Sequence, residues 1–262
     1  MKKNLISILI TNYNKEKFLK KSIVSCLQQN YRKKEIIVLD DLSTDSSKEI
    51  LKKIKSKDLK VIYNKKRKYK SGPLNQLDGI KRLFKISKGN IIFLLDSDDF
   101  FLKSKIKFIQ NKFKEDKKLN FIQDRPYSNQ KKSSIKLKKK NHLFSIWPSF
   151  YPTSCIALRR NFFKNFLKLS YSKKFPNLEI DARLCIYAHL IQEFKTINKI
   201  LTVYNYDQYG ITSKYKKFSV NWWKKRNEAF EYMKILMKRM NIKFIFSFDY
   251  YFTKSINFFI KK

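Results

Sequence analysis

The stretch Ile91-Ile92-Phe93-Leu94-Leu95-Asp96-Ser97-Asp98-Asp99 decides how this chain folds. Its five apolar residues, which follow Gly89, predict a buried parallel strand. Three carboxylates then emerge at the C-terminal end of that strand, where open α/β sheets bind their ligands. Crowded carboxylates repel one another unless a cation neutralises them, and oxygen ligands favour Mg²⁺ or Mn²⁺, which would in turn hold a diphosphate. The stretch therefore predicts an α/β fold with a divalent cation at one sheet edge. The alternative is an acidic turn that only caps the next helix.

The residues before this stretch alternate between strand and helix patterns. Strands are predicted at 5–11, 35–39, 60–63 and 91–95, with helices at 17–29, from Ser46 through Ile54, and from Gly72 to Gly89. This order implies a parallel sheet with right-handed crossovers. The remainder is less regular: we expect helices near 103–114, 181–191 and 221–240, strands at 155–158, 195–197 and 201–204, and a basic loop at 131–140.

Composition indicates a globular protein with a large excess of positive charge. The 262 residues are 43% hydrophobic, include 23 Phe, 15 Tyr and 3 Trp, and carry a net charge of +39. Such a charge suits an anionic partner, either nucleic acid, an anionic membrane surface or a phosphorylated substrate. Lysine is nevertheless spread along every segment, which favours a general compositional bias over a specific binding patch.

The cysteines and the N-terminus indicate a cytoplasmic protein. Cys26, Cys155 and Cys185 are odd in number and far apart, which argues against a disulfide framework or a zinc site. Met1-Lys2-Lys3 and the apolar residues after it look like a signal peptide, but the apolar run is short and lacks a small-residue cleavage site. We therefore interpret that run as the first strand.

Polar side chains follow three strands of the predicted sheet. Thr11, Tyr13 and Asn14 come after the first strand, Asp40 and Asp41 after the second, and the acidic cluster after the fourth. Parallel neighbours bring these ends to one edge. There Tyr13 is placed to stack on a pyrimidine base, Asp40 to accept from its ring N–H, and a metal to bridge two phosphates. Taken singly, Asn14 is also a helix-cap residue and Asp40-Asp41 a turn former, so the prediction depends on all three together.

Three motifs in order, ILITNYN at 8–14, EIIVLDDLSTD at 35–45 and LDSDD at 95–99, resemble glycosyltransferase family 2, whose members have the GT-A fold. The resemblance covers residues 4–100. It implies a Rossmann-like, mostly parallel sheet with helices on both faces, and an inverting transferase that uses a nucleotide sugar, with a UDP-sugar favoured, and a divalent cation. On this basis residues 1–100 are the donor-binding half and 101–220 the half of the same GT-A domain that binds a glycan or lipid-linked acceptor, while 221–262 are C-terminal helices that suit a membrane surface.

The resemblance also implies roles for single residues. It places Thr11, Tyr13, Asn14, Asp40, Asn75 and Asp96 at the nucleotide, with Asp40 on the base and Asp96 on the ribose side, and it places Asp98 on the metal with Asp99 beside it. Two departures stand out. Leu42 replaces the usual glycine after the aspartate pair, and Leu74 replaces the arginine that commonly precedes the asparagine.

The second half matches more faintly. Glu179-Ile180-Asp181-Ala182-Arg183-Leu184 resembles the acidic pair before a helix, which implies Asp181 as the general base, with Glu179 as the alternative. Asn205 stands where an arginine is common, so Arg183, Lys214 or Lys217 are candidates for the missing phosphate contact. Candidates for the acceptor cleft are Trp147, Thr153, Ser154 and Glu179, although Trp147 is equally suited to ordinary packing.

Two other functions compete with a transferase. A haloacid-dehalogenase-like phosphatase also carries D-x-D after a strand, but that motif usually lies near the start of the chain. A basic nucleic-acid-binding protein would account for the charge, yet no binding motif is present and we expect no nucleic acid partner. The aromatic tail 244–260 and its lysines suit either the inner surface of a membrane or packing on the protein's own core.

Overall fold

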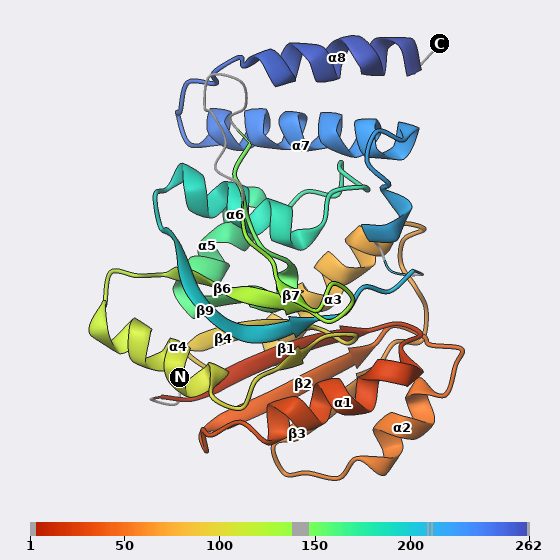
Figure 1. Cartoon of the computed structure of the whole chain (residues 1–262), viewed down its shortest axis with the longest axis vertical. Helices are drawn as coiled ribbons and strands as arrows, with labels where there is room; N and C mark the ends of the chain where they lie inside the picture. The colour runs from red at the N-terminus through yellow and green to blue at the C-terminus, as the bar shows by residue number, and fades with distance from the viewer. Residues whose placement is uncertain (1–3, 138–146, 209, 211, 261–262) are drawn as a thin grey trace.

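The computed structural model describes residues 4–137, 147–208, 210 and 212–260, which form a nine-stranded sheet and eight α-helices (Figure 1). The first part runs β1 (Ile6–Asn12), α1 (Glu16–Leu27), β2 (Lys34–Asp40), α2 (Ser47–Lys53), β3 (Leu59–Tyr63), α3 (Gly72–Ile86) and β4 (Ile91–Asp96). It continues with β5 (Phe100–Phe101), α4 (Lys105–Glu115), β6 (Phe121–Ser128), β7 (Ser133–Ser134), the 3₁₀ turn η1 (Thr153–Cys155), β8 (Ile156–Arg159) and α5 (Arg160–Ser170). The last elements are α6 (Ile180–Leu190), β9 (Phe194–Tyr204), the 3₁₀ turn η2 (Thr212–Lys214), α7 (Val220–Arg239) and α8 (Phe248–Ile260).

The first half of the sheet is parallel, as predicted. Strands lie in the order β3-β2-β1-β4, with Thr11 of β1 opposite Asp96 of β4 and Asn12 opposite Asp40 of β2. The carboxyl ends of these strands therefore meet at one edge. Beyond β4 the sheet is mixed, because β8 is antiparallel to both β4 and β6, whereas β6 and β9 run parallel. One continuous sheet thus runs through both of the halves expected on either side of residue 100.

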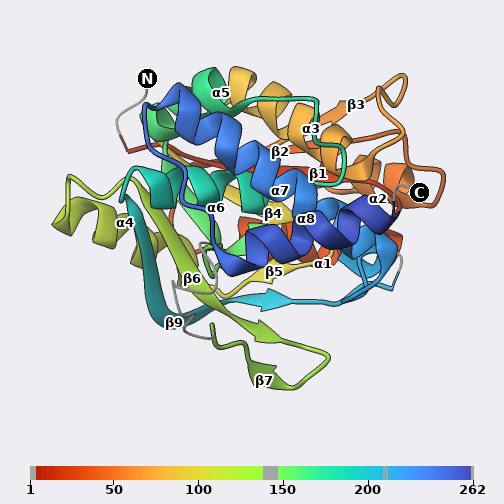
Figure 2. The ribbon, with the colours of Figure 1, turned by 90° about the horizontal axis from the view of Figure 1, so that it is seen from above.

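Each face of the sheet has its own hydrophobic core. Alternate residues of β1 divide between them: Ile8 and Ile10 pack with α1, α2 and α4, whereas Leu9 packs with α3, α5 and α6. On the second face α7 lies over α5 and α6, and α8 lies outermost on α7 (Figures 1 and 2). The expected arrangement of helices on both faces is confirmed.

Gly89 has a different role from the one predicted. The helix α3 begins as expected, with Ser71 accepting a hydrogen bond from the backbone N of Leu74 at 3.1 Å, but it ends at Ile86 rather than at Gly89. A Cβ on Gly89 would lie 2.5 Å from the backbone N of Ser7. Glycine is therefore needed because the connection into β4 passes directly against β1.

Apart from the two-residue strands β5 and β7, one strand and one helix were not predicted from the sequence. Strand β6 includes Gln123, Asp124 and Pro126, which are untypical of a buried strand, and α5 follows β8 without a break. In addition, the two strands predicted at 195–197 and 201–204 are one strand, β9, whose register against β6 shifts on either side of Arg125. In the stretch predicted as a basic loop, Ser133–Ser134 form β7, and residues 138–140 lie outside the described residues.

Candidate active site

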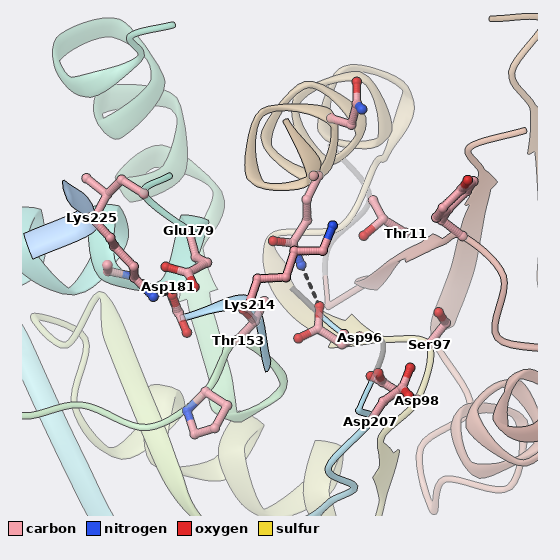
Figure 3. Close-up of a pocket in the computed structure, with 18 of the residues that line it drawn as sticks. Thr11, Asp96, Ser97, Asp98, Thr153, Glu179, Asp181, Asp207, Lys214 and Lys225 are labelled. Carbon is pink, nitrogen blue, oxygen red and sulfur yellow. Dashed lines mark hydrogen bonds and ion pairs between the residues drawn. The ribbon is translucent and has the colours of Figure 1, made fainter. Parts of the chain in front are cut away.

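A cavity of about 660 Å³ opens at the carboxyl ends of β1 and β4 and extends to the first turns of α6 and α7. Charged side chains of both signs line it. The described carboxylates are those of Asp41, Asp96, Asp98, Glu179, Asp181 and Asp207, and the described cations are Lys15, Arg67, Lys70, Lys214, Lys225 and Arg226. Figure 3 shows Asp96 and Asp98 on one side of the cavity and Glu179 and Asp181 on the other, with Lys214 between them in that view.

Asp96 occupies the end of β4 and faces the cavity. Its Oδ1 accepts a hydrogen bond from Nε2 of Gln76 at 2.7 Å, and its backbone N donates to Oγ of Ser154 at 3.0 Å. Burial, followed by the charges of Asp98 and Asp181, raises the pKa of Asp96 to about 8. Gln76 was not predicted as a site residue, and its only signal in the sequence is its position next to Asn75.

Asp98 shares a cation with Asp207, a residue that the sequence analysis missed. Nζ of Lys15 lies 2.7 Å from Oδ2 of Asp98 and also contacts the carboxylate of Asp207. Burial alone would lower the pKa of Lys15, but the two carboxylates outweigh it and raise that pKa. The position between Asp98 and Asp207 therefore accommodates positive charge.

These oxygens are of the type that Mg²⁺ and Mn²⁺ prefer, so the donor set fits a divalent cation once the ammonium of Lys15 has left. Protein side chains alone do not complete such a site. Among the described residues, no three His, Cys, Asp or Glu side chains are grouped to hold a metal ion. A divalent cation here would depend on ligands from a bound diphosphate or water, which is how Mg²⁺ is commonly held.

Asp99 points away from the cavity. Its Oδ2 accepts from Oγ of Ser154 at 2.6 Å, its Oδ1 accepts from the backbone N of Asn205 at 2.7 Å, and the side chain is buried. Burial and the charges of Asp98 and Asp96 raise its pKa well above the usual range. Asp99 and Ser154, expected at the metal and at the acceptor, thus connect β4 to the segments before β8 and after β9.

In the acidic pair after β2, as in the pair Asp98-Asp99, one carboxylate is buried and the other lines the cavity. Asp40 is fully buried and accepts from Nδ2 of Asn12 at 2.9 Å and from Oγ of Ser43 at 2.6 Å, and it is not among the described residues that line the cavity. Asp41 does line it, where Nδ2 of Asn64 donates to its Oδ1 at 2.6 Å and Nε of Arg67 lies 3.3 Å from its Oδ2. The carboxylate available to a ligand is therefore that of Asp41, although the base contact was expected from Asp40.

Tyr13 and Thr11 line the cavity beside Asp41, as expected. The Tyr13 ring is 40% exposed, and the guanidinium of Arg67 lies 3.5 Å from its centroid. Asn14 is outside the cavity lining of the described residues, where its Oδ1 accepts from the backbone N of Thr44 at 2.8 Å. Asn14 therefore fixes the loop after β2.

Asn75 lines the cavity but its side-chain amide is engaged. Its Oδ1 accepts from the backbone N of Tyr69 at 3.0 Å, and its Nδ2 donates to the carbonyl of the same residue at 2.8 Å. This pair of bonds holds the loop that brings Arg67 and Lys70 to the cavity. Neither of these two cations was predicted as a site residue.

The opposite wall is formed by the start of α6 and by α7. Glu179 forms an ion pair with Lys225, whereas the Oδ1 of Asp181 accepts from the backbone N of the next residue, Ala182, at 2.6 Å. Burial and the nearby charge of Glu179 raise the pKa of Asp181 to about 7. Asp181 is therefore a carboxylate that exchanges a proton near neutral pH, as a general base requires.

Other expected residues of this wall lie as follows. Thr153 and Trp147 line the cavity, and the Trp147 ring packs at 6.1 Å from that of Phe230. Of the three cations considered for the missing phosphate contact, Lys214 lines the cavity and Lys217 does not. Arg183 is fully buried and donates to the carbonyls of residues 172, 175 and 178, which excludes it from that contact.

A model of the family described as glycosyl transferase family 2 matches residues 7–174, well over half of the chain. The chain belongs to this family. Membership confirms the resemblance found in the three motifs and decides against the phosphatase.

Two curated relatives from bacteria match parts of this family member. The UDP-Glc:alpha-D-GlcNAc-diphosphoundecaprenol beta-1,3-glucosyltransferase WfaP of Escherichia coli is 38% identical over 102 residues, 39% of this chain and 38% of that protein. An uncharacterized glycosyltransferase of Haemophilus influenzae is 34% identical over 120 residues, 45% of this chain and 42% of that protein. The matches thus span less than half the length of either relative.

Solved structures show the same fold. TarS 1–349 of S. aureus, in complex with UDP-GlcNAc, superposes with a TM-score of 0.67 at 17% identity, covering 92% of this chain and 68% of that one. The mannosyltransferase PcManGT of Pyrobaculum calidifontis, in complex with GDP-Man and Mn²⁺, gives a TM-score of 0.62 at 11% identity, covering 86% and 63%. These likenesses confirm the GT-A fold.

Proposed function

We propose that this family member is a metal-dependent, inverting glycosyltransferase. It transfers a sugar from a nucleoside-diphosphate sugar, in the first instance a UDP-sugar, to a hydroxyl of a glycan or lipid-linked acceptor. The observation that carries the proposal is the placement of Asp98 and Asp181 on opposite walls of one cavity (Figure 3). Inversion by direct displacement needs the leaving diphosphate and the attacking hydroxyl on opposite faces of the anomeric carbon.

The nucleotide end is assigned to the edge formed by β1, β2 and β4. Asp41 accepts from the base, and the exposed ring of Tyr13, already stacked under Arg67, offers an aromatic surface to it. Asp96, held by Gln76, faces the ribose side. The UDP-GlcNAc bound by TarS and the UDP-Glc in the name of WfaP support a uridine donor.

The diphosphate end is assigned to Asp98, Asp207 and the cations beside them. When bound, a divalent cation would neutralise the charge that develops on the leaving diphosphate. Asp98 would hold it, with Asp207 available as a second oxygen ligand, and Lys15 would move away. Lys214 reaches the same space and supplies the phosphate contact that Asn205 does not. The Mn²⁺ in PcManGT supports this assignment.

The acceptor end is assigned to the α6 wall. Asp181 takes the proton of the acceptor hydroxyl. At the same time the hydroxyl oxygen bonds to the anomeric carbon, and the bond from that carbon to the diphosphate breaks. Glu179 is held by Lys225 and orients the wall, while Trp147 and Thr153 bound the space beside it. WfaP, whose name includes a diphosphoundecaprenol acceptor, supports a lipid-linked acceptor.

Titration calorimetry with UDP, with and without Mn²⁺, tests the donor and metal assignments, after a thermal-shift panel of UDP-, GDP-, dTDP- and CMP-sugars. We expect Mn²⁺ to raise the affinity for UDP in the wild type and in Glu115→Gln, a control that removes an exposed carboxylate paired with Lys112. Asp98→Asn should lose that increase while keeping its thermal stability. Equal affinity for UDP with and without Mn²⁺ in the wild type would refute the metal role, and stabilisation only by another nucleotide sugar would refute the uridine donor.

A further inference from the structure

Helix α8 differs from an ordinary surface helix in which side it buries, because much of its polar side faces the protein. Nδ2 of Asn257 donates to the carbonyl of Trp223 at 3.0 Å, and Nε of Arg226 donates to Oγ1 of Thr253 at 3.0 Å. Arg226 also forms an ion pair with Asp249 at 2.6 Å. The helix is thus attached to α7 by hydrogen bonds and an ion pair as well as by the buried ring of Tyr250, which packs at 5.4 Å from that of Phe230. A helix packed on the protein's own core would bury most of its apolar side instead.

The outward side of α8 is aromatic instead. Five of its aromatic residues and two apolar residues just before it are each at least 50% exposed: Ile245, Phe246, Phe248, Tyr251, Phe252, Phe258 and Phe259. Their spacing of three, four and seven residues within α8 places them along one stripe. We call this set the aromatic face. Contiguous exposed apolar surface of this kind marks a binding surface in a soluble domain.

Ring contacts connect the aromatic face to the cavity. Phe248 stacks on Phe252 at 6.2 Å, Phe252 meets Trp223 edge-on at 5.6 Å, and Trp223 meets Trp222 at 4.6 Å. Trp222 lines the cavity, and the exposed Phe218 lies 5.5 Å from it. A chain of ring contacts, which passes through the buried Trp223, therefore connects α8 to the rim of the candidate active site.

Lysines accompany the exposed rings. Nζ of Lys217 lies 4.6 Å from the centroid of Phe218, and Nζ of Lys234 lies 5.9 Å from that of Phe246. Lys243, just before the aromatic face, is exposed, and the whole chain carries a charge of +39. A second copy of this chain would bring an equally positive surface against these lysines, whereas an anionic bilayer complements both the charge and the apolar rings.

We propose that the aromatic face of α8 docks on an anionic membrane surface, with the helix lying in the plane of the interface. No described helix is long and apolar enough to cross a membrane, so such contact would be peripheral. The docked orientation puts the aromatic path beside the bilayer, where it admits the apolar chain of a lipid-linked acceptor to the cavity rim. That last consequence rests on the proposed function, whereas the docking itself does not.

Co-sedimentation with vesicles tests the proposal on the full chain. Vesicles of phosphatidylcholine alone are compared with vesicles containing 30% phosphatidylglycerol, a composition chosen for the assay. We expect the wild type to pellet with the anionic vesicles and the triple variant Tyr251→Ser/Phe258→Ser/Phe259→Ser to pellet at least fivefold less. The matched control is Tyr63→Ser, which removes an exposed aromatic from β3 on the opposite side of the molecule (Figure 1). It should bind as the wild type does.

The outcomes separate the alternatives. Equal pelleting of the triple variant and the wild type, or binding that ignores lipid charge, would overturn the proposal. So would a wild-type dimer in light scattering that the triple variant converts to monomer without any vesicle binding, because a second copy would then cover the face. Phe259→Ser alone, at a ring that is 71% exposed, tests the same point should the triple variant fold poorly. Calorimetry with UDP should be unchanged in these variants, so failure of docking and failure of the transferase assignment are distinguishable.

Discussion

Replacing Asp181 by asparagine tests whether this residue is the general base. The amide keeps the shape of the side chain and can still accept from the backbone N of Ala182, but it cannot take a proton. General base catalysis contributes about 10²–10⁴-fold, so kcat should fall at least ~100-fold while the affinity for UDP is kept.

The dependence of the transfer rate on pH gives a second, independent test of Asp181 as the base. Burial and Glu179 raise the pKa of Asp181 to about 7, so the wild-type rate should be half of its plateau near pH 7 and about one tenth of it at pH 6. A carboxylate with an ordinary pKa would give a flat profile over the same range. Glu179→Gln removes a charge that raises this pKa, so its profile should shift to lower pH and activity should remain.

Stability should change in the opposite direction from activity. A carboxyl whose pKa is raised by folding stabilises the native state only while it is protonated, so its contribution is lost as pH rises from about 4 to 7. A shift of this pKa from 3.8 to about 7 lowers the free energy of unfolding at pH 8 by at most about 4 kcal/mol. Asp181→Asn should therefore have a higher Tm than the wild type at pH 8 and nearly the same Tm at pH 4.

The assay is single-turnover transfer from the donor selected by the thermal-shift panel, with thermal melts of the same samples. Near wild-type transfer by Asp181→Asn together with an inactive Glu179→Gln would refute the reasoning and move the base to Glu179. A flat profile between pH 5 and 9 in the wild type would refute the link between burial and catalysis.

Three further predictions concern the cation position, the two aspartates after β2 and a buried ion pair outside the cavity. Lys15→Met removes the competing ammonium, so the affinity for Mn²⁺ without nucleotide, measured by electron paramagnetic resonance, should rise roughly tenfold; no change would show that Lys15 does not occupy the cation position. Asp41→Asn should weaken UDP binding about tenfold or more in calorimetry, whereas Asp40→Asn should chiefly lower Tm, and the reverse result would restore the original base assignment. Lys105→Met leaves Asp124 unpaired where both side chains are fully buried, and denaturant unfolding should show a loss of about 3–5 kcal/mol that Asp124→Leu in the same chain largely restores.

The sequence was sufficient for the parts of the fold that depend on local pattern. The apolar runs ending at Thr11, Asp40 and Asp96 predicted three adjacent parallel strands because a parallel sheet buries both faces and needs no alternation. Strand β6 was not predicted, because its polar residues find their partners through tertiary contacts. Gln123 donates to the carbonyl of Tyr151 at 2.7 Å, and Asp124 is neutralised by a lysine from α4. Such partners are distant in the chain, so no window of sequence contains the pair.

Partners that are distant in the chain also limit what the sequence predicts about the candidate site. Both acidic motifs contain adjacent aspartates, and in each pair one carboxylate faces the cavity while the other is buried and ties loops together. Asp41 and Asp98 face the cavity, whereas Asp40 and Asp99 accept from buried donors. The two members of a pair are the same residue type at adjacent positions, so the sequence does not distinguish them. Which carboxylate faces the cavity depends on the direction that the chain takes after its strand. For Asp40 the donors are the nearby Ser43 and the more distant Asn12, and for Asp99 both donors lie more than 50 residues away, so the family motif alone does not specify the direction.

For Asp99 those donors belong to the second half of the chain. Ser154 precedes β8 and Asn205 follows β9, and Nδ2 of Asn205 also donates to the backbone carbonyl of Asp98 at 2.6 Å. The geometry of the proposed metal ligand is therefore determined by segments outside residues 1–100, although the motif lies within them. Asn205, which stands where an arginine was expected, is consequently a structural residue beside the proposed diphosphate end. Its replacement by a cation at this position would remove the support of Asp98 rather than supply a phosphate contact.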